Sequence, residues 1–445
     1  MLLNRLLENA VLPLGDLVLG TSFIRSLNRV RTYDHLSAYE LAALQAQRLQ
    51  KTLHHASNYS AFYHGFTSSV EASPVDWLKS FPILTKGILR ERSADLLTSP
   101  PYGLIKKSSS GSSGVQSSIY LSSHELSFQR AMFAHWWNWT GYRIGDPMIQ
   151  TGISLPRGFI KATKDRLFRI RYISAYSHKQ GEIIRLLRSL QGRPPFCLGG
   201  YSSSLYLFSK IAEEEGIDGV RLRSVIAWGD NMFTQYRNTI ERVFSTRVFE
   251  TYGCSEGLMI AAQKDVDYLY IMTPGVYLEI LDDEGREVPD GKLGHVVVTS
   301  LTARAMPLIR YQLGDLAIKL PKSAYPKDRE LNYPLLQKVI GRDTDIVKTR
   351  SGKFMVVHSF TGIFEHIPEI RQFRVIQRDL DAIVVEYIPG RGFDLAILDT
   401  IKEKIHDGLG ESLYLTFKPV ANIPPTASGK PQIILSLLKS PRDPE

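Results

Sequence analysis

The chain has 445 residues, of which 43% are hydrophobic and 22% are charged. This is the composition of an ordinary globular protein, which excludes intrinsic disorder, a collagen-like repeat and a coiled coil, and the length predicts two to three domains. Lys and Arg outnumber Asp and Glu by 54 to 45, a net charge of +9, yet no run of five or more basic residues occurs. We therefore expect anionic small-molecule substrates and no nucleic-acid partner.

The cysteine content limits the kinds of site that are available. Cys197 and Cys254 are the two cysteines of the chain, which is too few for a disulfide framework or a four-cysteine zinc site. Free thiols in a chain of this size are typical of a reducing compartment, so we expect a cytoplasmic protein.

The first apolar stretch, residues 11–20, is far shorter than the ~20 residues that a membrane span needs. Glu8 precedes it, Asp16 interrupts it, and no small-residue cleavage site follows it. Neither a transmembrane segment nor a signal peptide is therefore predicted. We interpret the stretch as a helix packed on the domain surface, and shallow membrane attachment is the alternative.

The pattern up to about residue 250 predicts helices followed by alternating strands and helices. The first hundred residues are mostly helical in pattern, and a helix is predicted over residues 125–139. Asp230 or Asn231 is the expected N-cap of a later helix. This rhythm predicts a parallel sheet with helices on its faces. Strands are predicted over residues 148–151, 225–228 and 247–251, and a helix over residues 203–215 lies between the first two of them.

After Gly275 the pattern becomes antiparallel, because apolar residues alternate along residues 276–280 and a second strand returns over residues 295–300. A second change near Gly341 introduces a small α+β pattern. The predicted fold class is α/β: a large multi-sheet domain over residues 1–340 and a small mobile domain over 341–445, with a hinge near 341–345. The expected elements of the small domain are strands 373–377 and 383–387, a helix carrying Leu398, Ile401, Ile405 and Leu409, and a last strand 413–419.

Residues 108–114 read Ser-Ser-Ser-Gly-Ser-Ser-Gly. Two glycines allow successive backbone N–H groups to point into one concavity, and the hydroxyls add donors, as a polyphosphate site requires. The loop is not a Walker motif, because Val115 stands where that motif has Lys. A flexible Ser/Gly linker would have the same composition.

Residues 252–257 read Tyr-Gly-Cys-Ser-Glu-Gly and follow a predicted strand. Glu256 offers the carboxylate oxygen that Mg²⁺ prefers beside a phosphate, and Tyr252 offers a ring that stacks on a base. The same residues match G-x-S-x-G, which would make Ser255 the nucleophile of a hydrolase elbow. A plain turn with a buried tyrosine is the third interpretation.

Three further motifs carry one candidate residue each. Asp315, in Arg-Tyr-Gln-Leu-Gly-Asp, is suited to bind two ribose hydroxyls. Arg342, in Gly-Arg-Asp-Thr-Asp, lies at the expected domain junction, where it would reach a phosphate or ribose. Lys430 ends Pro-Pro-Thr-Ala-Ser-Gly-Lys, an exposed loop from which a mobile lysine can neutralise phosphate charge. Each residue also has a structural alternative: Asp315 could cap a turn, Arg342 could form a salt bridge in a surface turn, and Lys430 could belong to a tail linker.

Together and in this order, the five motifs resemble those of the adenylate-forming superfamily of acyl-CoA ligases, peptide-synthetase adenylation domains and luciferases. The resemblance covers about residues 100–432. Within the superfamily the chain is most similar to the phenylacetate–CoA ligase branch, because of Pro-Leu-Ile-Arg-Tyr at 307–311 and Gly-Gly-Tyr-Ser at 199–202. Many members of that branch belong to polysaccharide or secondary-metabolite pathways.

The resemblance implies an ATP- and Mg²⁺-dependent enzyme that converts a carboxylic acid to an acyl-adenylate with release of pyrophosphate. The acyl group then passes to CoA or to the phosphopantetheine of a carrier protein. An amide ligase with an amine acceptor is the nearest alternative. A serine esterase or acyltransferase using Ser255 and a nucleotide-binding protein without turnover are more remote ones. A homodimer is compatible with the sequence.

The resemblance also implies the site residues. The catalytic residues would be Lys430, Arg342 and Glu256, and Glu256 would also be the magnesium ligand. Asn231 stands where the branch has a Glu that contacts adenine. The implied ATP-binding residues are Ser109, Ser110, Gly111, Ser112, Ser113, Gly114, Gly229, Asp230, Asn231, Tyr252, Gly253, Ser255 and Asp315.

The chain departs from the family pattern at several positions. Val115 and Gln116 replace a Lys-Pro pair, and Leu313 replaces a Thr of the ribose motif. Thr344 stands where the family commonly has its hinge Asp or Lys, so we expect altered domain rotation in the thiol-transfer step. Separately, an aromatic run predicts either an aryl-binding pocket or core packing. Its members are Phe133, Trp136, Trp137 and Trp139.

Overall fold

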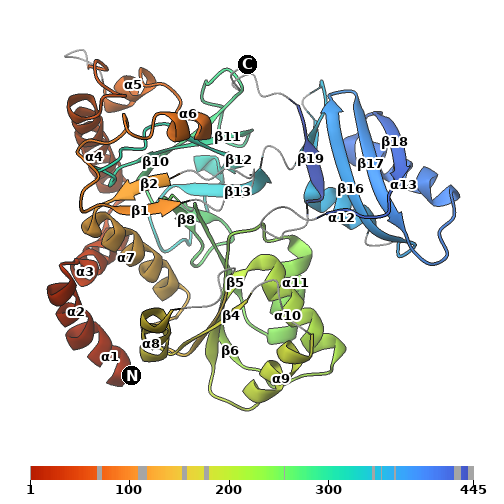
Figure 1. Ribbon diagram of the computed structural model, residues 1–445, viewed down its shortest axis with the longest axis horizontal. Helices are drawn as coiled ribbons and strands as arrows, with labels where there is room; N and C mark the ends of the chain where they lie inside the picture. The colour runs from red at the N-terminus through yellow and green to blue at the C-terminus, as the bar shows by residue number, and fades with distance from the viewer. Residues whose placement is uncertain are drawn as a thin grey trace.

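The expected α/β fold class is confirmed in the computed structural model, which contains one large mixed sheet and a separate four-stranded sheet near the C-terminus (Figure 1). The large sheet carries the middle of the chain, and the small sheet carries its last quarter. The structure describes residues 2–67, 73–108, 118–152, 158–174, 180–254, 256–342, 346–351, 353–364, 367–424 and 432–438.

The N-terminal region is helical, as the sequence predicts. The long helix α4 begins at a capping box, in which Ser37 and Glu40 satisfy each other's backbone N–H groups. Its buried leucines Leu41, Leu49 and Leu53 pack toward the large sheet. The elements are α1 (Leu2–Leu6), a π-helical turn (Leu7–Val11), α2 (Leu12–Leu19), α3 (Phe23–Thr32), a 3₁₀ turn (Tyr33–His35), α4 (Ala38–Tyr59), α5 (Pro74–Lys79) and α6 (Lys86–Glu91).

The large sheet has a parallel half and an antiparallel half. Strand β7 joins them, because it pairs in parallel with β6 and antiparallel with β8. The predicted change from βαβ rhythm to antiparallel pairing is therefore a change within one sheet. In spatial order the strands are β10 (Val276–Leu281), β11 (Leu293–Ser300), β12 (Tyr311–Lys319), β13 (Leu335–Arg342), β9 (Leu269–Ile271), β8 (Met259–Ala262), β7 (Val248–Gly253), β6 (Leu222–Trp228), β5 (Phe196–Tyr201), β3 (Met148–Gly152) and β4 (Ile170–Ser174).

Helices cover the parallel half, and their apolar faces form a core with its strands (Figure 1). Leu205 and Phe208 of the helix after β5 and Ile240 of the helix after β6 are buried against Val225 and Val248. The helices are α7 (Ser123–Trp139), α8 (Phe159–Leu167), α9 (Gln180–Leu190), α10 (Ser202–Glu214) and α11 (Thr234–Phe244), and a short antiparallel pair, β1 (Ile105–Ser108) and β2 (Ser118–Leu121), precedes α7.

The C-terminal region forms its own core beneath a sheet of order β18-β17-β16-β19. Gln377 of β16 exchanges hydrogen bonds with the backbone of Lys348, which fixes the first strand of this region to the sheet. The strand predicted over residues 413–419 is confirmed, but it is not the last one, because a further strand pairs with β16 in parallel. The elements are β14 (Ile346–Lys348), β15 (Phe354–Val356), α12 (Val357–Phe364), β16 (Ile370–Asp379), β17 (Ala382–Pro389), α13 (Ala396–Leu409), β18 (Tyr414–Pro419) and β19 (Ile434–Ser436).

The aromatic run on α7 is part of the core. Trp136 is 1% exposed, and the ring of Trp137 stacks on that of Trp228 at 5.7 Å between centroids. Trp139 donates a hydrogen bond to Asp34 and packs against Tyr333. Packing of α7 against the sheet therefore explains these residues.

The apolar stretch at residues 11–20 is helical and lies on the surface, as the sequence predicts, with Val11 and Leu12 packed against the cluster around Leu7 and Leu27. Helix α2 has no buried residue among Leu12–Leu19, and the side chains near its end are exposed. Across the described residues, none of the helices has the length and apolar character that crossing a bilayer requires.

Candidate functional site

The C-terminal end of β7 meets β12 through a hydrogen bond between two predicted site residues. The hydroxyl of Tyr252 donates to Oδ2 of Asp315 at 2.8 Å. Burial and the adjacent Asp315 carboxylate raise the pKa of Tyr252 well above its ordinary value. The phenol therefore stays protonated at neutral pH and holds the carboxylate in place as a donor.

Arg342 lies opposite Asp315 on the neighbouring strand. The register of β12 and β13 pairs these two residues directly. Asn231 contacts the end of β13 beside this pair: its Nδ2 donates to the carbonyl of Ile340 at 3.1 Å. A Cβ at Gly341 would lie 2.7 Å from that Nδ2. The loop after β6 and the end of β13 are thus in contact beside Asp315.

Glu256 is the second carboxylate of the region, and it is 6% exposed. The hydroxyl of Tyr311 donates to Oε1 of Glu256 at 2.8 Å. Burial and the Glu256 charge raise the pKa of Tyr311, so this phenol is also a protonated donor. Burial raises the pKa of the neighbouring Cys254 thiol well above its usual range, which makes Cys254 a neutral residue and a poor nucleophile.

Tyr311 is held by an unusual residue before it. Arg310 has a left-handed backbone with φ of 49°, which non-glycine residues rarely adopt. Its buried guanidinium pairs with Glu279 at 3.1 Å and donates to the carbonyl of Phe81 at 3.1 Å. These contacts compensate the strained turn and fix the direction in which β12 begins.

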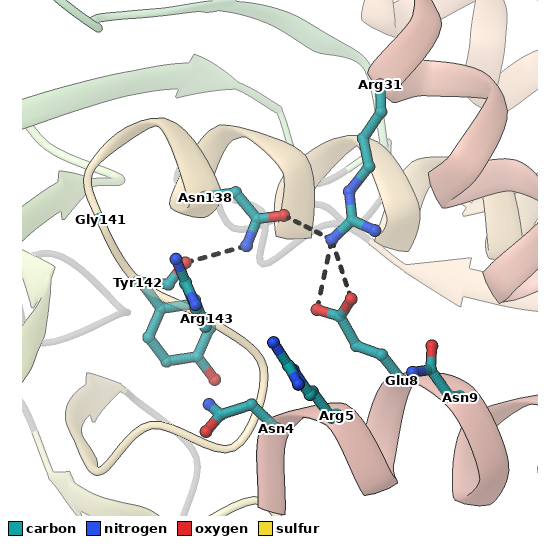
Figure 2. Close-up of a pocket in the computed structure, with 9 residues that line it drawn as sticks. All are labelled: Asn4, Arg5, Glu8, Asn9, Arg31, Asn138, Gly141, Tyr142 and Arg143. Atoms are coloured by element: carbon teal, nitrogen blue, oxygen red, sulfur yellow. Dashed lines mark hydrogen bonds and ion pairs between the residues drawn. The ribbon is translucent and has the colours of Figure 1, made fainter. Parts of the chain in front are cut away.

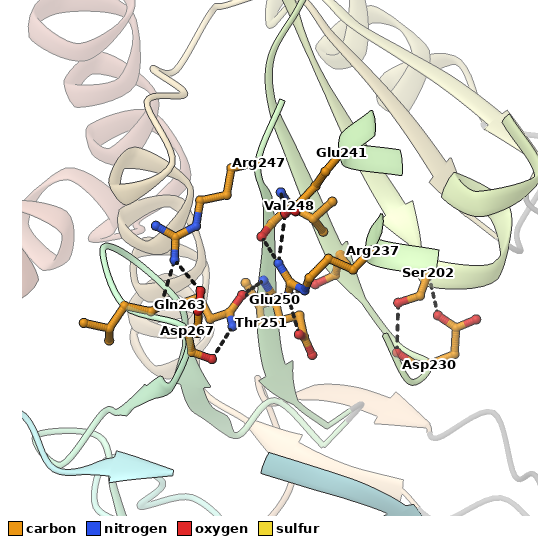
Figure 3. A network of polar contacts seen from close by, with 12 residues as sticks. Ser202, Asp230, Arg237, Glu241, Arg247, Val248, Glu250, Thr251, Gln263 and Asp267 are labelled. Atoms are coloured by element: carbon orange, nitrogen blue, oxygen red, sulfur yellow. Dashed lines mark hydrogen bonds and ion pairs between the residues drawn. The ribbon is translucent and has the colours of Figure 1, made fainter. Parts of the chain in front are cut away.

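A polar network fixes β7 to its neighbours (Figure 3). Arg237 of α11 donates to Glu241, to the carbonyl of Val248 and to Glu250, the last at 2.5 Å. Gln263 accepts from Arg237 and from the backbone N–H of Glu250. The network joins α11, β7 and the segment after β8, and it therefore positions Tyr252 at the end of β7.

Asp230 has a structural partner that the sequence does not reveal. Its carboxylate accepts hydrogen bonds from the backbone N–H groups of Ser202 and Ser203, the first two residues of α10. The prediction that Asp230 or Asn231 is the N-cap of α11 is wrong, because Phe233 occupies that position. Asp230 caps the preceding helix instead.

Two glycines of the predicted ATP-binding set make close backbone contacts. Gly229 has φ of 81°, and a Cβ there would lie 2.6 Å from the ring of Tyr201. A Cβ at Gly253 would lie 2.7 Å from the carbonyl oxygen of Leu258. Both positions require glycine, which is a packing reason for their presence.

Lys107 is a residue of this region that the sequence analysis did not single out. It lies on β1 one residue before the end of that strand, and its Nζ donates to Oε1 of Gln129 at 3.1 Å. Gln129 is also the neighbour of Gly257, where a Cβ would lie 2.3 Å from it. Burial lowers the pKa of Lys107, and Arg130 adds to that effect. The clue in the sequence is that Lys107 directly precedes the Ser/Gly loop.

Several predicted residues lie outside the described residues, so their placement is not part of this site. They are Ser109, Ser110, Gly111, Ser112, Ser113, Gly114, Ser255, Thr344 and Lys430. The described neighbours show only where their segments begin and end: at Ser108 and Ser118, at Cys254 and Glu256, at Arg342 and Ile346, and at Pro424 and Gln432.

A separate polar cavity of about 500 Å³ lies beside the N-terminal helix (Figure 2). Its lining includes Arg5, Arg31 and Arg143, and Glu8 pairs with Arg31 at 3.2 Å. It shares no lining residue with the site around Asp315 and Glu256.

Comparisons with known proteins agree with the fold and the motifs. Residues 347–436 match the family model described as the CapK C-terminal domain. The chain is 23% identical to Protein CapK of Staphylococcus aureus over 420 residues, which is 90% of each protein. It is 28% identical to phenylacetate-coenzyme A ligase of Pseudomonas putida over 355 residues, which is 74% of this chain and 75% of the relative.

The fold is also that of a solved ligase. The crystal structure of 2-hydroxyisobutyryl-CoA ligase in the postadenylation state superposes with a TM-score of 0.66 at 20% identity, covering 93% of this chain and 92% of that one. The sequence relatives and this fold point to the same group of ligases that the five motifs resemble. In sequence and in fold the chain is therefore similar to adenylate-forming CoA ligases, and phenylacetate–CoA ligase and CapK are among its relatives.

Proposed function

We propose that this chain is an acid–thiol ligase that works through an acyl-adenylate. A carboxylate oxygen of the acid attacks the α-phosphorus of ATP, and the bond from that phosphorus to the β-phosphate oxygen breaks as pyrophosphate leaves. A thiol then attacks the acyl carbon, AMP leaves, and the thiol proton passes to solvent. The thiol would belong to CoA or to a carrier-protein phosphopantetheine.

The observation that supports this proposal is the convergence of Tyr252, Asp315 and Arg342 at one place in the sheet. The Asp315 carboxylate would accept hydrogen bonds from the ribose hydroxyls, with Tyr252 fixing its orientation. Arg342 would add a positive charge beside the nucleotide, and Asn231 would contact the base from the loop after β6. Positioning and charge neutralisation of this kind are what phosphoryl chemistry requires of a protein.

Glu256 would hold Mg²⁺ together with phosphate oxygens and water. Mg²⁺ is bound in nucleotide sites by one or two carboxylates plus substrate phosphates, and Glu256 is a buried carboxylate whose orientation Tyr311 fixes. Within the described residues there is no group of three or more His, Cys, Asp or Glu side chains that would make an all-protein metal site. The ion, when bound, would neutralise charge on the leaving phosphates.

Lys107 is a further candidate for contact with the triphosphate. It lies at the start of the Ser/Gly-rich segment and reaches Gln129 next to Gly257. Burial lowers the pKa of Lys107 because it disfavours the charged form, and an anionic phosphate nearby would stabilise that charged form. We propose that Lys107 binds the β- or γ-phosphate.

The acid would enter next to Gly257. A recess of about 10 Å³ there is lined by Phe128, Met132, Leu258 and Met259, among others. This volume holds about one water, so an acyl chain fits only if the flexible methionines move. We propose an apolar acid whose chain displaces Met132 and Met259.

The test is pyrophosphate release by the purified chain with ATP and Mg²⁺ over a panel of carboxylic acids, followed by CoA consumption with the best acid. We expect release that depends on the acid, and thioester formation when CoA is added. The best acid is also tested with a panel of amines in place of CoA, and a thioester without any amide product would separate a thiol ligase from an amide ligase. Acid-independent ester hydrolysis without pyrophosphate release would contradict the proposal and favour the Ser255 alternative.

A further inference from the structure

The N-terminal helix carries an apolar stripe that the protein itself does not cover. Helix α1, the π-helical turn and α2 follow one another without a break from Leu2 to Leu19, about 27 Å of helix. Leu2, Leu6, Ala10 and Leu14 lie four residues apart, and all are exposed. The opposite side packs inward: Leu7 is buried against Leu27, Ala131 and Ile144. The exposed fractions are 87% for Leu2, 56% for Leu6 and 62% for Leu14 on the stripe, and 80% for Leu17, 73% for Val18 and 74% for Leu19 around the exposed end of α2.

The acidic residues of this region are turned away from solvent. Asp16 accepts from Thr21 and from the backbone N–H groups of Phe23 and Ile24 at the start of α3. Glu8 pairs with Arg31 at 3.2 Å. Asp34, just beyond α3, accepts from Trp139 and Tyr333 of the core. Each carboxylate is thus partly buried and held by internal donors.

The exposed charges of the same region are basic. Arg5 lies beside Leu6 on the helix that carries the stripe, residues 2–19 (the stripe helix), and Arg25 and Arg29 are exposed on α3. The polar edge of the stripe helix also lines the cavity of Figure 2. The lining of that cavity contains three guanidinium groups and one carboxylate. Among residues 2–36, which the structure describes throughout, every fully charged exposed side chain is therefore an arginine.

We propose that the N-terminal helix docks this protein onto an anionic lipid bilayer, lying in the plane of the interface. An apolar face flanked by basic residues is the pattern of helices that lie on membranes. No described helix is suited to cross a bilayer, so the contact is interfacial and reversible. In Figure 1 the stripe helix lies at the opposite side of the molecule from the C-terminal sheet, so docking leaves that sheet uncovered.

Charge favours a bilayer over a second copy of the chain as the occupant. In a symmetric dimer the same patch meets itself, which would bring the basic surroundings of Arg5, Arg25 and Arg29 together. Like charges facing each other across an interface oppose association. Anionic lipid head groups attract the same three arginines, and each arginine is expected to raise the binding constant for the bilayer about fivefold.

The test is flotation of the full chain, tagged at its C-terminus, with vesicles of phosphatidylcholine alone or mixed with phosphatidylglycerol. We expect binding to the mixed vesicles that high salt weakens. Leu17→Asp is expected to lower vesicle binding more than tenfold. The double variant Arg25→Gln, Arg29→Gln is expected to lower binding to the anionic vesicles by about fivefold for each arginine removed. Leu395→Asp is the matched control, because Leu395 is 70% exposed in the C-terminal region.

Each outcome decides the proposal. Vesicle binding that Leu17→Asp abolishes and Leu395→Asp leaves intact supports it. Failure of the parent chain to float, or equal binding by Leu17→Asp, overturns it. Light scattering on the same samples covers the remaining case: a dimer that Leu17→Asp converts to a monomer, without vesicle binding, assigns the stripe to self-association. Thermal unfolding of each variant checks that these surface substitutions leave the fold intact.

Discussion

The hydroxyl of Tyr252 and Oδ2 of Asp315 are 2.8 Å apart, which links the strand that joins the two halves of the sheet to a strand of the antiparallel half. Asp315 in turn lies opposite Arg342, the last described residue before the C-terminal region. A nucleotide bound to Asp315 would therefore contact three strands at once. This arrangement relates nucleotide binding to the segment where the two predicted domains meet.

Tyr252→Phe is expected to raise the KM for ATP about tenfold or more. The substitution keeps the ring but removes the donor that orients the Asp315 carboxylate, and a hydrogen bond to a charged group contributes about 1.5–3 kcal/mol. Steady-state pyrophosphate release against ATP concentration measures the change. Tyr270→Phe is the matched control, because Tyr270 donates to Asp265 at 3.0 Å elsewhere in the sheet. Equal effects of both substitutions would assign Tyr252 to stability alone.

Tyr311→Phe is expected to raise the Mg²⁺ concentration needed for half-maximal activity. Glu256→Gln is expected to reduce the rate of pyrophosphate release by a factor of about 10²–10³. Tyr311 fixes one oxygen of Glu256, so its loss leaves the proposed metal ligand less well oriented. Tyr333→Phe is the control, since Tyr333 is equally buried and donates to Asp34 at 3.0 Å. An unchanged Mg²⁺ requirement in Tyr311→Phe would remove Glu256 from the metal site.

Lys107→Met is expected to slow pyrophosphate release about tenfold or more and to leave the melting temperature nearly unchanged. The reason is the loss of a partly buried cation next to the proposed triphosphate site. Lys106→Met is the matched control, because Lys106 is the exposed neighbour on the same strand. If the two variants behave alike, Lys107 has no role in the reaction.

The sequence was sufficient to predict the main elements and the motifs that meet. The βαβ rhythm gives the parallel half, and alternating apolar residues from Val276 onward give the antiparallel half. The motif order placed Tyr252, Asp315 and Arg342 in one site, although no periodicity could show that their strands pair. The partnership of Tyr311 with Glu256 depends on that pairing, so it became visible only in three dimensions.

The errors come from contacts between distant segments. Asp230 precedes a helix, which favours an N-cap, yet Ser202 and Ser203 offer unsatisfied N–H groups across the sheet. Strand β19 is only three residues long, so its pattern is too short to be recognised. Helix α2 has the apolar content of a packed helix, and only tertiary structure reveals that Leu14, Leu17, Val18 and Leu19 stay exposed.

Lys430→Ala is expected to reduce pyrophosphate release by about 10²–10³ without lowering the melting temperature. The family resemblance gives this lysine the role of bridging the carboxylate and the α-phosphate, and its Pro/Gly-containing segment lies between β18 and β19. Lys402→Ala, an exposed lysine on α13, is the control. Near-normal release by Lys430→Ala would remove this residue from the adenylation step.

Thr344 is expected to influence thiol transfer more than adenylation. We propose that the C-terminal region pivots between β13 and β14, within the segment that separates Arg342 from Ile346. A charged residue at the pivot would be solvated in both orientations, whereas Thr is β-branched and stiff at χ1, which favours one orientation. Adenylation needs Lys430 in the site, and transfer needs it withdrawn.

Two substitutions at this position separate a hinge from a spacer. Thr344→Asp is expected to change the rate of thiol transfer while pyrophosphate release stays near normal, because charge relieves the bias toward one orientation. Thr344→Pro is expected to impair transfer most, since proline fixes φ and removes a backbone N–H. Single-turnover measurements of each half-reaction, started from ATP and from preformed acyl-adenylate, give the two rates separately. If both substitutions slow the two half-reactions equally, Thr344 is not the hinge, and the pivot lies elsewhere in the connection from β13 to β14.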